Sequence, residues 1–145
     1  MRIIAGSARG KRIKAPAGVN TRPITDMIKE ALFNVLGPAV ADAAFLDLFA
    51  GSGSVGLEAL SRGARFVVFI DNDINAIKSI KDNLVNCGFT SNYEVYRNDV
   101  FRALDMLNRK GSKFDYIYVD PPFTNEAIFD KAIKYLDTVD LLAED

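Results

Sequence analysis

The sequence contains no histidine and only one cysteine, Cys87, among its 145 residues. Without histidine, Ser-His and Cys-His nucleophilic pairs and histidine-ligated metal sites are excluded. A single cysteine builds neither an internal disulfide nor a cysteine zinc cluster, and this usage is typical of a reducing compartment. Carboxylates, lysines and the backbone remain as the groups that could carry chemistry, and we expect no metal.

Long hydrophobic runs are also missing. No stretch approaches the roughly 20 apolar residues of a membrane span, and the start MRIIAGSARGKRIK lacks the continuous apolar segment of a secretory signal. The composition, 49% hydrophobic and 26% charged, supplies enough material for one buried core. We therefore expect one cytoplasmic, monomeric globular unit without membrane contact.

The charges are unevenly distributed although the net charge is only −1. The N-terminal segment before the first acid, Asp26, contains basic residues only among its charged residues: Arg2, Arg9, Lys11, Arg12, Lys14 and Arg22. A positive arm on an acidic body favours a polyanion partner such as RNA. A solvated basic hairpin that protects a sheet edge is the alternative, and charge alone does not separate the two.

The N-terminal third predicts a hairpin followed by a helix. Residues 2–5 and 12–15 flank SARGK, in which two glycines are available for turns. Thr25 is a good N-cap, and apolar residues recur from there at helical spacing until Gly37 and Pro38 end the pattern. We expect residues 1–23 to form a basic arm and residues 24–145 to form the main domain.

Short apolar runs then alternate with helical stretches. The runs are FLDLF (45–49), FVVFI (66–70), YEVYR (93–97) and FDYIYV (114–119), and helices are expected near 54–62, 73–87, 99–109 and 125–137. Strands that are apolar throughout and alternate with helices indicate a parallel sheet covered on both faces. The sequence predicts a doubly wound, mostly parallel α/β fold that binds ligands at the carboxyl ends of its strands. Because the series ends on a helix, we expect further C-terminal strands to be missing and the fourth strand to be an open edge.

A glycine-rich loop follows the first expected strand. In DLFAGSGSVGLEAL (47–60), Gly51, Gly53 and Gly56 fit the G-x-G-x-x-G pattern, which lets the backbone approach a ligand at a helix N-terminus. Asp71 ends the second strand, where a carboxylate can accept hydrogen bonds from ribose hydroxyls. These features alone fit a nicotinamide cofactor as well as any other adenosyl ligand.

Two further acids favour S-adenosylmethionine. Asp47 lies in the first strand, where a carboxylate would repel a pyrophosphate but could hold the ammonium group of S-adenosylmethionine. Asp99 follows the third strand, where it could accept a hydrogen bond from the adenine amino group. A partly buried polar residue and a helix N-cap are the structural alternatives for Asp47 and Asp99.

The fourth strand ends in DPPF. Neither Pro121 nor Pro122 can extend a strand, so the chain must turn rigidly there. Asp120 and the Pro121 carbonyl could accept the two hydrogens of an exocyclic amine, while Phe123 stacks on the base. That arrangement would turn the amine lone pair toward a methyl donor.

DLFAGSGSVGLEAL with DPPF resembles a class I S-adenosylmethionine-dependent methyltransferase that acts on planar amines. RIIAGSARGKRIKAP and TRPITDMIKEALFNVL resemble more narrowly the RsmD-type family, bacterial methyltransferases that form N2-methylguanine in 16S ribosomal RNA. The resemblance implies target-base contact at Asp120 to Phe123 and RNA contact through the basic arm. The cofactor contacts that it implies are Asp47, Phe49, Gly51, Gly53, Asp71, Asn72, Asp99 and Val100.

The chain departs from the family pattern in two places. Arg22-Pro23-Ile24 stands where RPT is more frequent, and family members continue after LLAED into further strands. Three alternative functions stay open.

The first is methylation of another planar amine, in DNA adenine or protein glutamine. The second is an NAD-dependent oxidoreductase, and the third is a cofactor- or RNA-binding fragment without turnover.

Overall fold

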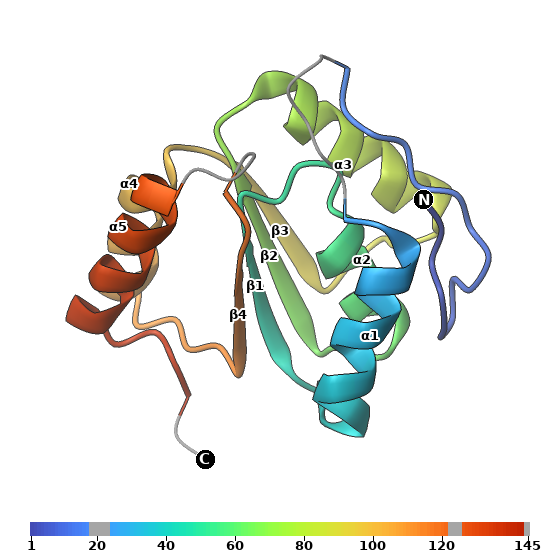
Figure 1. Cartoon of the computed structure of the whole chain (residues 1–145), viewed down its shortest axis with the longest axis horizontal. Helices are drawn as coiled ribbons and strands as arrows, with labels where there is room; N and C mark the ends of the chain where they lie inside the picture. Colours follow the sequence, from blue (N-terminus) through green and yellow to red (C-terminus); the bar gives the residue numbers. More distant parts are fainter. Residues whose placement is uncertain (18–23, 122–125, 144–145) are drawn as a thin grey trace.

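The computed structural model describes residues 1–17, 24–121 and 126–143 (Figure 1). These residues contain a parallel sheet in the order β3-β2-β1-β4. Its strands are β1 (Ala44–Leu48), β2 (Phe66–Asp71), β3 (Tyr93–Arg97) and β4 (Tyr116–Val119). The predicted doubly wound α/β fold is confirmed.

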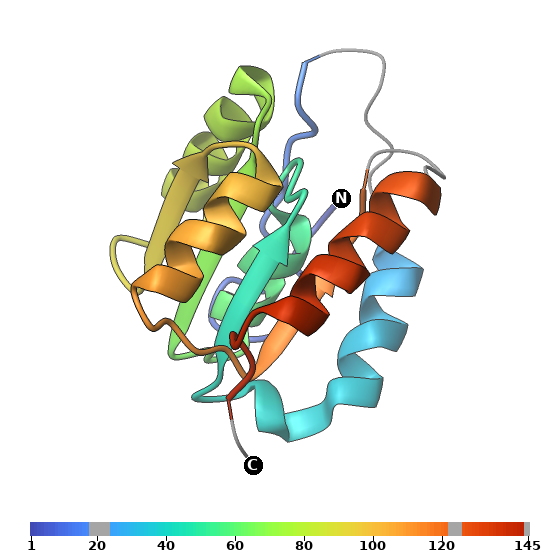
Figure 2. The same cartoon turned by 90° about the vertical axis from the view of Figure 1, so that its left-hand side faces the viewer.

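Helices cover both faces of the sheet, as the apolar strands predicted. They are α1 (Asp26–Leu36), the 3₁₀ turn η1 (Gly37–Val40), α2 (Ser54–Ser61), α3 (Ile74–Asn86), α4 (Val100–Arg109) and α5 (Glu126–Thr138). Helices α1, α2 and α3 lie on one side of the sheet, and α4 and α5 lie on the other (Figures 1 and 2).

The alternation of side chains along β1 divides the interior into two cores. Phe45 packs with residues of α1, α2 and α3, whereas Leu46 and Leu48 pack with residues of α4. Asp47 shares the face of Phe45, so its carboxyl group is directed toward α2.

Local capping explains where the helices begin and end. The Thr25 hydroxyl accepts a hydrogen bond from the Ile28 N–H at 3.2 Å, and an Asp73 oxygen accepts one from the Asn75 N–H at 3.0 Å. Gly63, Gly88 and Gly111 adopt positive φ just beyond α2, α3 and α4. The predicted helix bounds are correct to within one residue at each end.

Several predicted strand bounds are wrong by one or two residues. Phe49, predicted to be the last residue of the first strand, has left the sheet with φ 56°. The fourth strand begins at Tyr116 rather than at Phe114, which instead forms a parallel bridge with Leu142. The order of strands places β4 at an edge of the described sheet.

The hairpin of the N-terminal arm (residues 1–17) is shorter than the sequence predicts. It consists of one antiparallel bridge between Arg2 and Arg12, together with hydrogen bonds from Ile3 N–H to the Lys11 carbonyl and from Ile13 N–H to the Met1 carbonyl, both 2.9 Å. The Gly10 N–H also donates to the Ile3 carbonyl at 2.9 Å, and other backbone groups of the arm bond to residues of α1, α2 and α3.

Glu58 on α2 is the main anchor of the arm. Its carboxylate is fully buried and accepts hydrogen bonds from the Ile4 N–H at 2.9 Å and the Ala5 N–H at 3.1 Å. Gly6 lies so close to α2 that an added Cβ would stand 1.8 Å from the Ser61 carbonyl oxygen. The arm is therefore packed onto the domain through its backbone, and its basic side chains are left at the surface.

Within the described ranges, no helix combines the length and the apolar character that crossing a membrane requires. The same part of the chain contains no group of three or more His, Cys, Asp or Glu side chains arranged to hold a metal ion.

Candidate functional site

The candidate site lies at the carboxyl ends of the parallel strands. Asp47 and Asp71 belong to β1 and β2, Asp99 begins α4 after β3, and Asp120 follows β4. Because the strands are parallel, these four positions lie at the same end of the sheet, where the strands terminate, at the top of Figure 1. The structure thus brings together the acids that the sequence predicted.

The glycine loop has a backbone that only particular residues adopt easily. Gly51 and Gly53 have φ of 60° and 80°, and Phe49, a bulky residue, has φ 56°. An added Cβ at Gly51 would meet no atom within 4 Å, so the missing side chain leaves open space at the loop. A strained residue beside an open loop is typical of a ligand site.

Gly56 has a different role from the first two glycines. A Cβ at this position would stand 2.3 Å from a ring carbon of Phe69 on β2, so only glycine lets α2 pack this closely on the sheet. Its N–H donates to an Asp47 oxygen at 3.0 Å. The third glycine therefore fixes the helix and the first acid together.

Asp47 is buried, with 2% of its surface exposed. Burial raises the pKa of Asp47 well above its usual value, the Gly56 N–H opposes the shift, and the negative charges of Asp120 and Asp71 add to it. A cation in this space would offset these costs, which fits the ammonium group that the sequence predicted.

Asp71 braces the glycine loop. One of its oxygens accepts from the Gly51 N–H at 2.9 Å and the other from the Asp73 N–H at 2.9 Å. A carboxylate has about four acceptor positions, so Asp71 retains capacity for hydroxyl donors. Asn72, which follows it, accepts from the Arg97 side chain through its carbonyl oxygen at 3.4 Å.

Asp99 caps α4, since one of its oxygens accepts from the Arg102 N–H at 3.1 Å. The capping role that the sequence left as an alternative is therefore present. Val100 is buried in the core between β2 and α4. These observations leave any contact of Asp99 or Val100 with adenine as a prediction.

Asp120 lies beside a tyrosine that the sequence analysis missed. The Tyr118 hydroxyl donates to an Asp120 oxygen at 3.5 Å. Burial raises the pKa of Asp120, and the hydrogen bond from Tyr118 opposes this shift. The pKa of Tyr118 is also raised, mainly by burial and further by the negative charges of Asp120 and Asp47. Tyr118 lies two residues before Asp120, and residues at this spacing share one face of a strand. This spacing was the signal in the sequence that could have identified Tyr118.

Pro121 is buried directly after Asp120. Pro122 and Phe123, like Arg22 of the arm, lie outside the described residues. Their predicted roles stay predictions.

Lys29 was also missed, because a lysine on an amphipathic helix normally faces water. Its side chain is fully buried, and its amine donates to the Arg2 carbonyl at 2.7 Å and to the Ser54 hydroxyl at 2.9 Å. It also lies 3.3 Å from a Glu58 oxygen. Burial lowers the pKa of Lys29, and Glu58 opposes the shift. Lys29 thus joins the arm to the first turn of α2.

Asn83 on α3 makes a second connection of the same kind. Its amide nitrogen donates to the carbonyls of Lys14 and Ser52, both at 2.9 Å, and its oxygen accepts from the Lys14 N–H at 2.9 Å. One buried side chain therefore contacts both the arm and the glycine loop.

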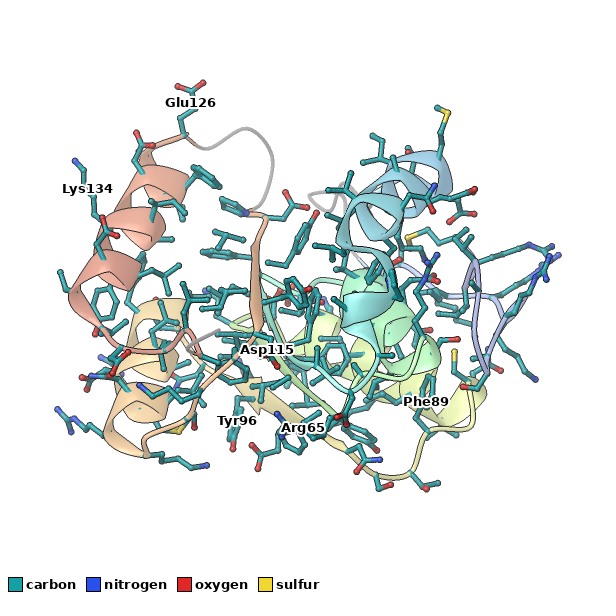
Figure 3. All side chains as sticks on the ribbon, turned by 90° about the horizontal axis from the view of Figure 1, so that it is seen from below. Arg65, Phe89, Tyr96, Asp115, Glu126 and Lys134 are labelled. Atoms are coloured by element: carbon teal, nitrogen blue, oxygen red, sulfur yellow. The ribbon has the colours of Figure 1, made fainter. Side chains whose placement is uncertain are left out.

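The predicted RNA-contacting side chains that are described lie at the surface of the arm. They are Arg2, Arg9, Lys11, Arg12 and Lys14. Figure 3 shows the arm at the opposite side of the molecule from Lys134 and Glu126 on α5, and Asp115, just before β4, lies between these two sides. The positive surface is thus separate from the far helical layer.

Comparisons with known proteins agree with this architecture. The family model described as Conserved hypothetical protein 95 matches residues 1–145. YlbH of Bacillus subtilis is 44% identical over 146 residues, which cover 100% of this chain and 78% of YlbH. Ribosomal RNA small subunit methyltransferase D of Escherichia coli is 37% identical over 145 residues, covering 100% of this chain and 71% of that protein.

Solved structures show the same fold. The yhhF protein of Escherichia coli is 37% identical, with a TM-score of 0.84 over 99% of this chain and 75% of that chain. SMU.776, described as a methyltransferase complexed with S-adenosylhomocysteine, is 19% identical, with a TM-score of 0.68 over 82% of this chain and 32% of that chain. That second likeness shows the fold alone. Since the family model spans the whole chain and its relatives match it from end to end, the chain belongs to the Conserved hypothetical protein 95 family, the RsmD family.

Proposed function

We propose that the chain transfers a methyl group from S-adenosylmethionine to the exocyclic N2 amine of a guanine in 16S ribosomal RNA. The observation that carries the proposal is the gathering of Asp47, Asp71 and Asp120 beside an open glycine loop. Their mutual repulsion contributes to the raised pKa of Asp47, so the site favours a positively charged ligand. S-adenosylmethionine carries a sulfonium and an ammonium group, whereas the pyrophosphate of NAD is negative.

The residues present fit this cofactor. The space beside Gly51, the N-terminus of α2 at Gly53 and the remaining acceptor capacity of Asp71 suit an adenosyl ligand whose ribose hydroxyls face Asp71. Asp47 would neutralise the ammonium group. Asn72, Asp99 and Val100 would surround the adenine, and Phe49 would line the pocket beside the loop.

When bound, the cofactor supplies a methyl carbon activated by the positive sulfur and departs as S-adenosylhomocysteine. The Asp120 carboxylate accepts a hydrogen bond from one N–H of the guanine amine, and the Pro121 carbonyl accepts one from the other. The nitrogen lone pair then faces the methyl carbon. Formation of the new N–C bond would accompany cleavage of the bond between sulfur and the methyl carbon, and the amine proton would pass to the Asp120 carboxylate and from there to water. The Tyr118 hydroxyl favours the ionised form of Asp120, which this acceptor role requires. Phe123 would stack on the base.

The basic arm would hold the RNA while the target base is turned out of its stack. The name of the Escherichia coli relative supports ribosomal RNA of the small subunit as the substrate class. We infer that the protein acts as a monomer in the cytoplasm, where ribosomal RNA is made.

The proposal is tested by incubating the protein with labelled S-adenosylmethionine and undermethylated small-subunit ribosomal RNA, and by digesting the product to nucleosides. We expect the label in N2-methylguanosine. Asp120→Ala should lower the rate of transfer by about 100-fold or more, because an oriented hydrogen-bond partner of the reacting group is lost. Affinity for S-adenosylhomocysteine, measured by calorimetry, should change little.

Asp137→Ala is the matched control, since it removes an exposed carboxylate from the far end of α5. Its transfer rate should equal that of the unaltered protein. Label in N6-methyladenine of DNA or in protein glutamine would replace the substrate that we propose. If the protein bound cofactor and RNA without any methyl transfer, it would be a binding fragment and not an enzyme. An Asp120→Ala variant with near-normal turnover would refute the role of Asp120.

A further inference from the structure

A cavity of about 550 Å³ lies between the arm and α3, away from the four acids of the candidate site. Its lining comprises Met1, Arg2, Arg12, Ile13, Lys14, Asp82, Asn83 and Asn86. Ligand sites typically have volumes of about 300–1,000 Å³, so the cavity has room for a nucleotide.

The charges that line this cavity are predominantly positive. Arg2, Arg12 and Lys14 contribute three cations, and within the described residues the charged ends of these side chains make no hydrogen bond or ion pair. Asp82 is the one acid of the lining, and its side chain is exposed. Three cations opposed by one exposed carboxylate leave the cavity with a positive charge, which favours an anionic ligand.

The wall of the cavity is rigid where it adjoins the candidate site. Asn83 holds Lys14 on one side and the Ser52 carbonyl of the glycine loop on the other. The Asn86 amide nitrogen donates to the Arg12 carbonyl at 3.0 Å, which fixes the same strand of the arm on α3 two residues before Lys14. The cations are therefore presented by a docked backbone.

The arm also connects the cavity to the edge of the sheet at which methyl transfer would occur. Beyond Lys14 the described arm runs upward past the beginning of α3 and reaches the end of the molecule where the strands terminate (Figure 1). A polyanion that lies along the arm would pass from the cavity toward Asp120. A long polyanion suits this path better than a small free anion.

We propose that the cavity between the arm and α3 is a second RNA site, which holds one nucleotide of the substrate outside the methyl-transfer site. This proposal rests on the proposed function. Arg2, Arg12 and Lys14 pair with the phosphodiester, while the partly exposed Met1 side chain offers apolar surface for the base. The site positions the RNA chain and takes no part in the transfer of the methyl group.

The first test compares two double variants of the same arm. Arg2→Gln/Lys14→Gln removes two charges from the cavity, and Arg9→Gln/Lys11→Gln removes two that do not line it. RNA affinity should fall about tenfold or more in the cavity pair and about threefold or less in the control pair. The log–log salt slope should become shallower by about 1.4 in the cavity pair. Equal losses in both pairs would indicate diffuse attraction and overturn the proposal.

The second test looks for a gain of affinity. Asp82→Asn removes the acid of the cavity and should tighten RNA binding about two- to fivefold at low salt, because a repelled phosphate loses its nearest negative neighbour. Asp137→Asn makes the same change on α5 and should leave RNA affinity unaltered. No gain for Asp82→Asn, or an equal gain for both variants, would contradict the assignment.

These tests separate the cavity from the methyl-transfer reaction, since they measure binding. Cavity variants that bind RNA normally while the unaltered protein methylates it would overturn the second site alone. RNA binding that depends on the cavity without any methyl transfer would overturn the proposed function alone. Displacement of RNA by equimolar guanosine monophosphate would show that the cavity takes a free nucleotide instead.

Discussion

The charge of Asp47 is unfavourable within the protein itself but would be useful in a complex with a cationic ligand. Burial raises the pKa of Asp47, as do the negative charges of Asp120, which follows β4, and of Asp71 at the end of β2; the Gly56 N–H on α2 only partly offsets this shift. Because its folded pKa exceeds the unfolded one, ionised Asp47 costs stability as the pH rises through that interval. A bound ammonium group would favour the ionised form and so lower this pKa.

Cofactor binding should therefore release a proton and weaken on acidification. We expect the affinity for S-adenosylhomocysteine to fall by up to about tenfold per pH unit below the pKa of Asp47 in the free protein. Calorimetry between pH 5 and 8, in buffers with different ionisation enthalpies, measures both quantities. Asp47→Asn should bind more weakly at high pH and lose this pH dependence. A flat profile in the unaltered protein would show that Asp47 does not pair with the ammonium group.

Sequence reasoning found the acids because strand order alone brings them together. It missed Tyr118, Lys29 and Asn83, whose roles depend on partners from other parts of the chain. It also extended β1 to Phe49, because nothing in a phenylalanine indicates a positive φ. Residue type and period predict which positions share an edge, whereas side-chain partners across long separations require the packed structure.

At the scale of elements, the junction between the arm and α2 depends on close backbone contact. The Glu58 carboxylate accepts hydrogen bonds from two N–H groups of the arm. The Ser61 hydroxyl accepts one from the Ala8 N–H at 2.9 Å and donates one to the Ala5 carbonyl at 2.6 Å. Gly6 makes this approach possible, since any side chain there would overlap the Ser61 carbonyl. These long-range bonds are why the paired part of the hairpin is so short.

Gly6→Ala should detach the arm, and Gly10→Ala provides a matched control. Both glycines have positive φ, 88° and 84°, so both substitutions pay a similar cost of about 1–2 kcal/mol in backbone strain. Only at Gly6 would the new Cβ meet an atom within 4 Å. We expect hydrogen exchange in residues 1–14 to accelerate much more for Gly6→Ala than for Gly10→Ala. Similar exchange in the two variants would contradict the packing role of Gly6.

At the scale of the whole molecule, the charge distribution separates two tasks. The described arm carries five basic side chains and no acid, whereas the acids of the candidate site lie at the carboxyl edge of the sheet. An RNA substrate would be attracted by the arm and a cationic cofactor by the sheet edge. Opposite surface potentials let the two bind without competing for the same groups.

The affinity for RNA should therefore depend on salt. If the arm contacts three to five phosphates, the logarithm of the association constant should fall with the logarithm of salt concentration at a slope of about −2 to −4. Fluorescence anisotropy with a labelled ribosomal RNA fragment between 50 and 300 mM salt measures the slope. Binding of S-adenosylhomocysteine, which does not use the arm, serves as the control. A flat response of the RNA would remove the arm from the interface.

The anchors of the arm also govern the order in which the chain reaches its final contacts. Ala8 bonds to a residue 53 positions later, and Arg12 bonds to Asn86, 74 positions later. At a synthesis rate of about 5–20 residues per second, α3 follows the arm by roughly 4 to 15 seconds. The arm leaves the ribosome before α2 and α3, yet it cannot dock until both helices have formed. Of these three segments, the one that is made first is thus the last to reach its final contacts.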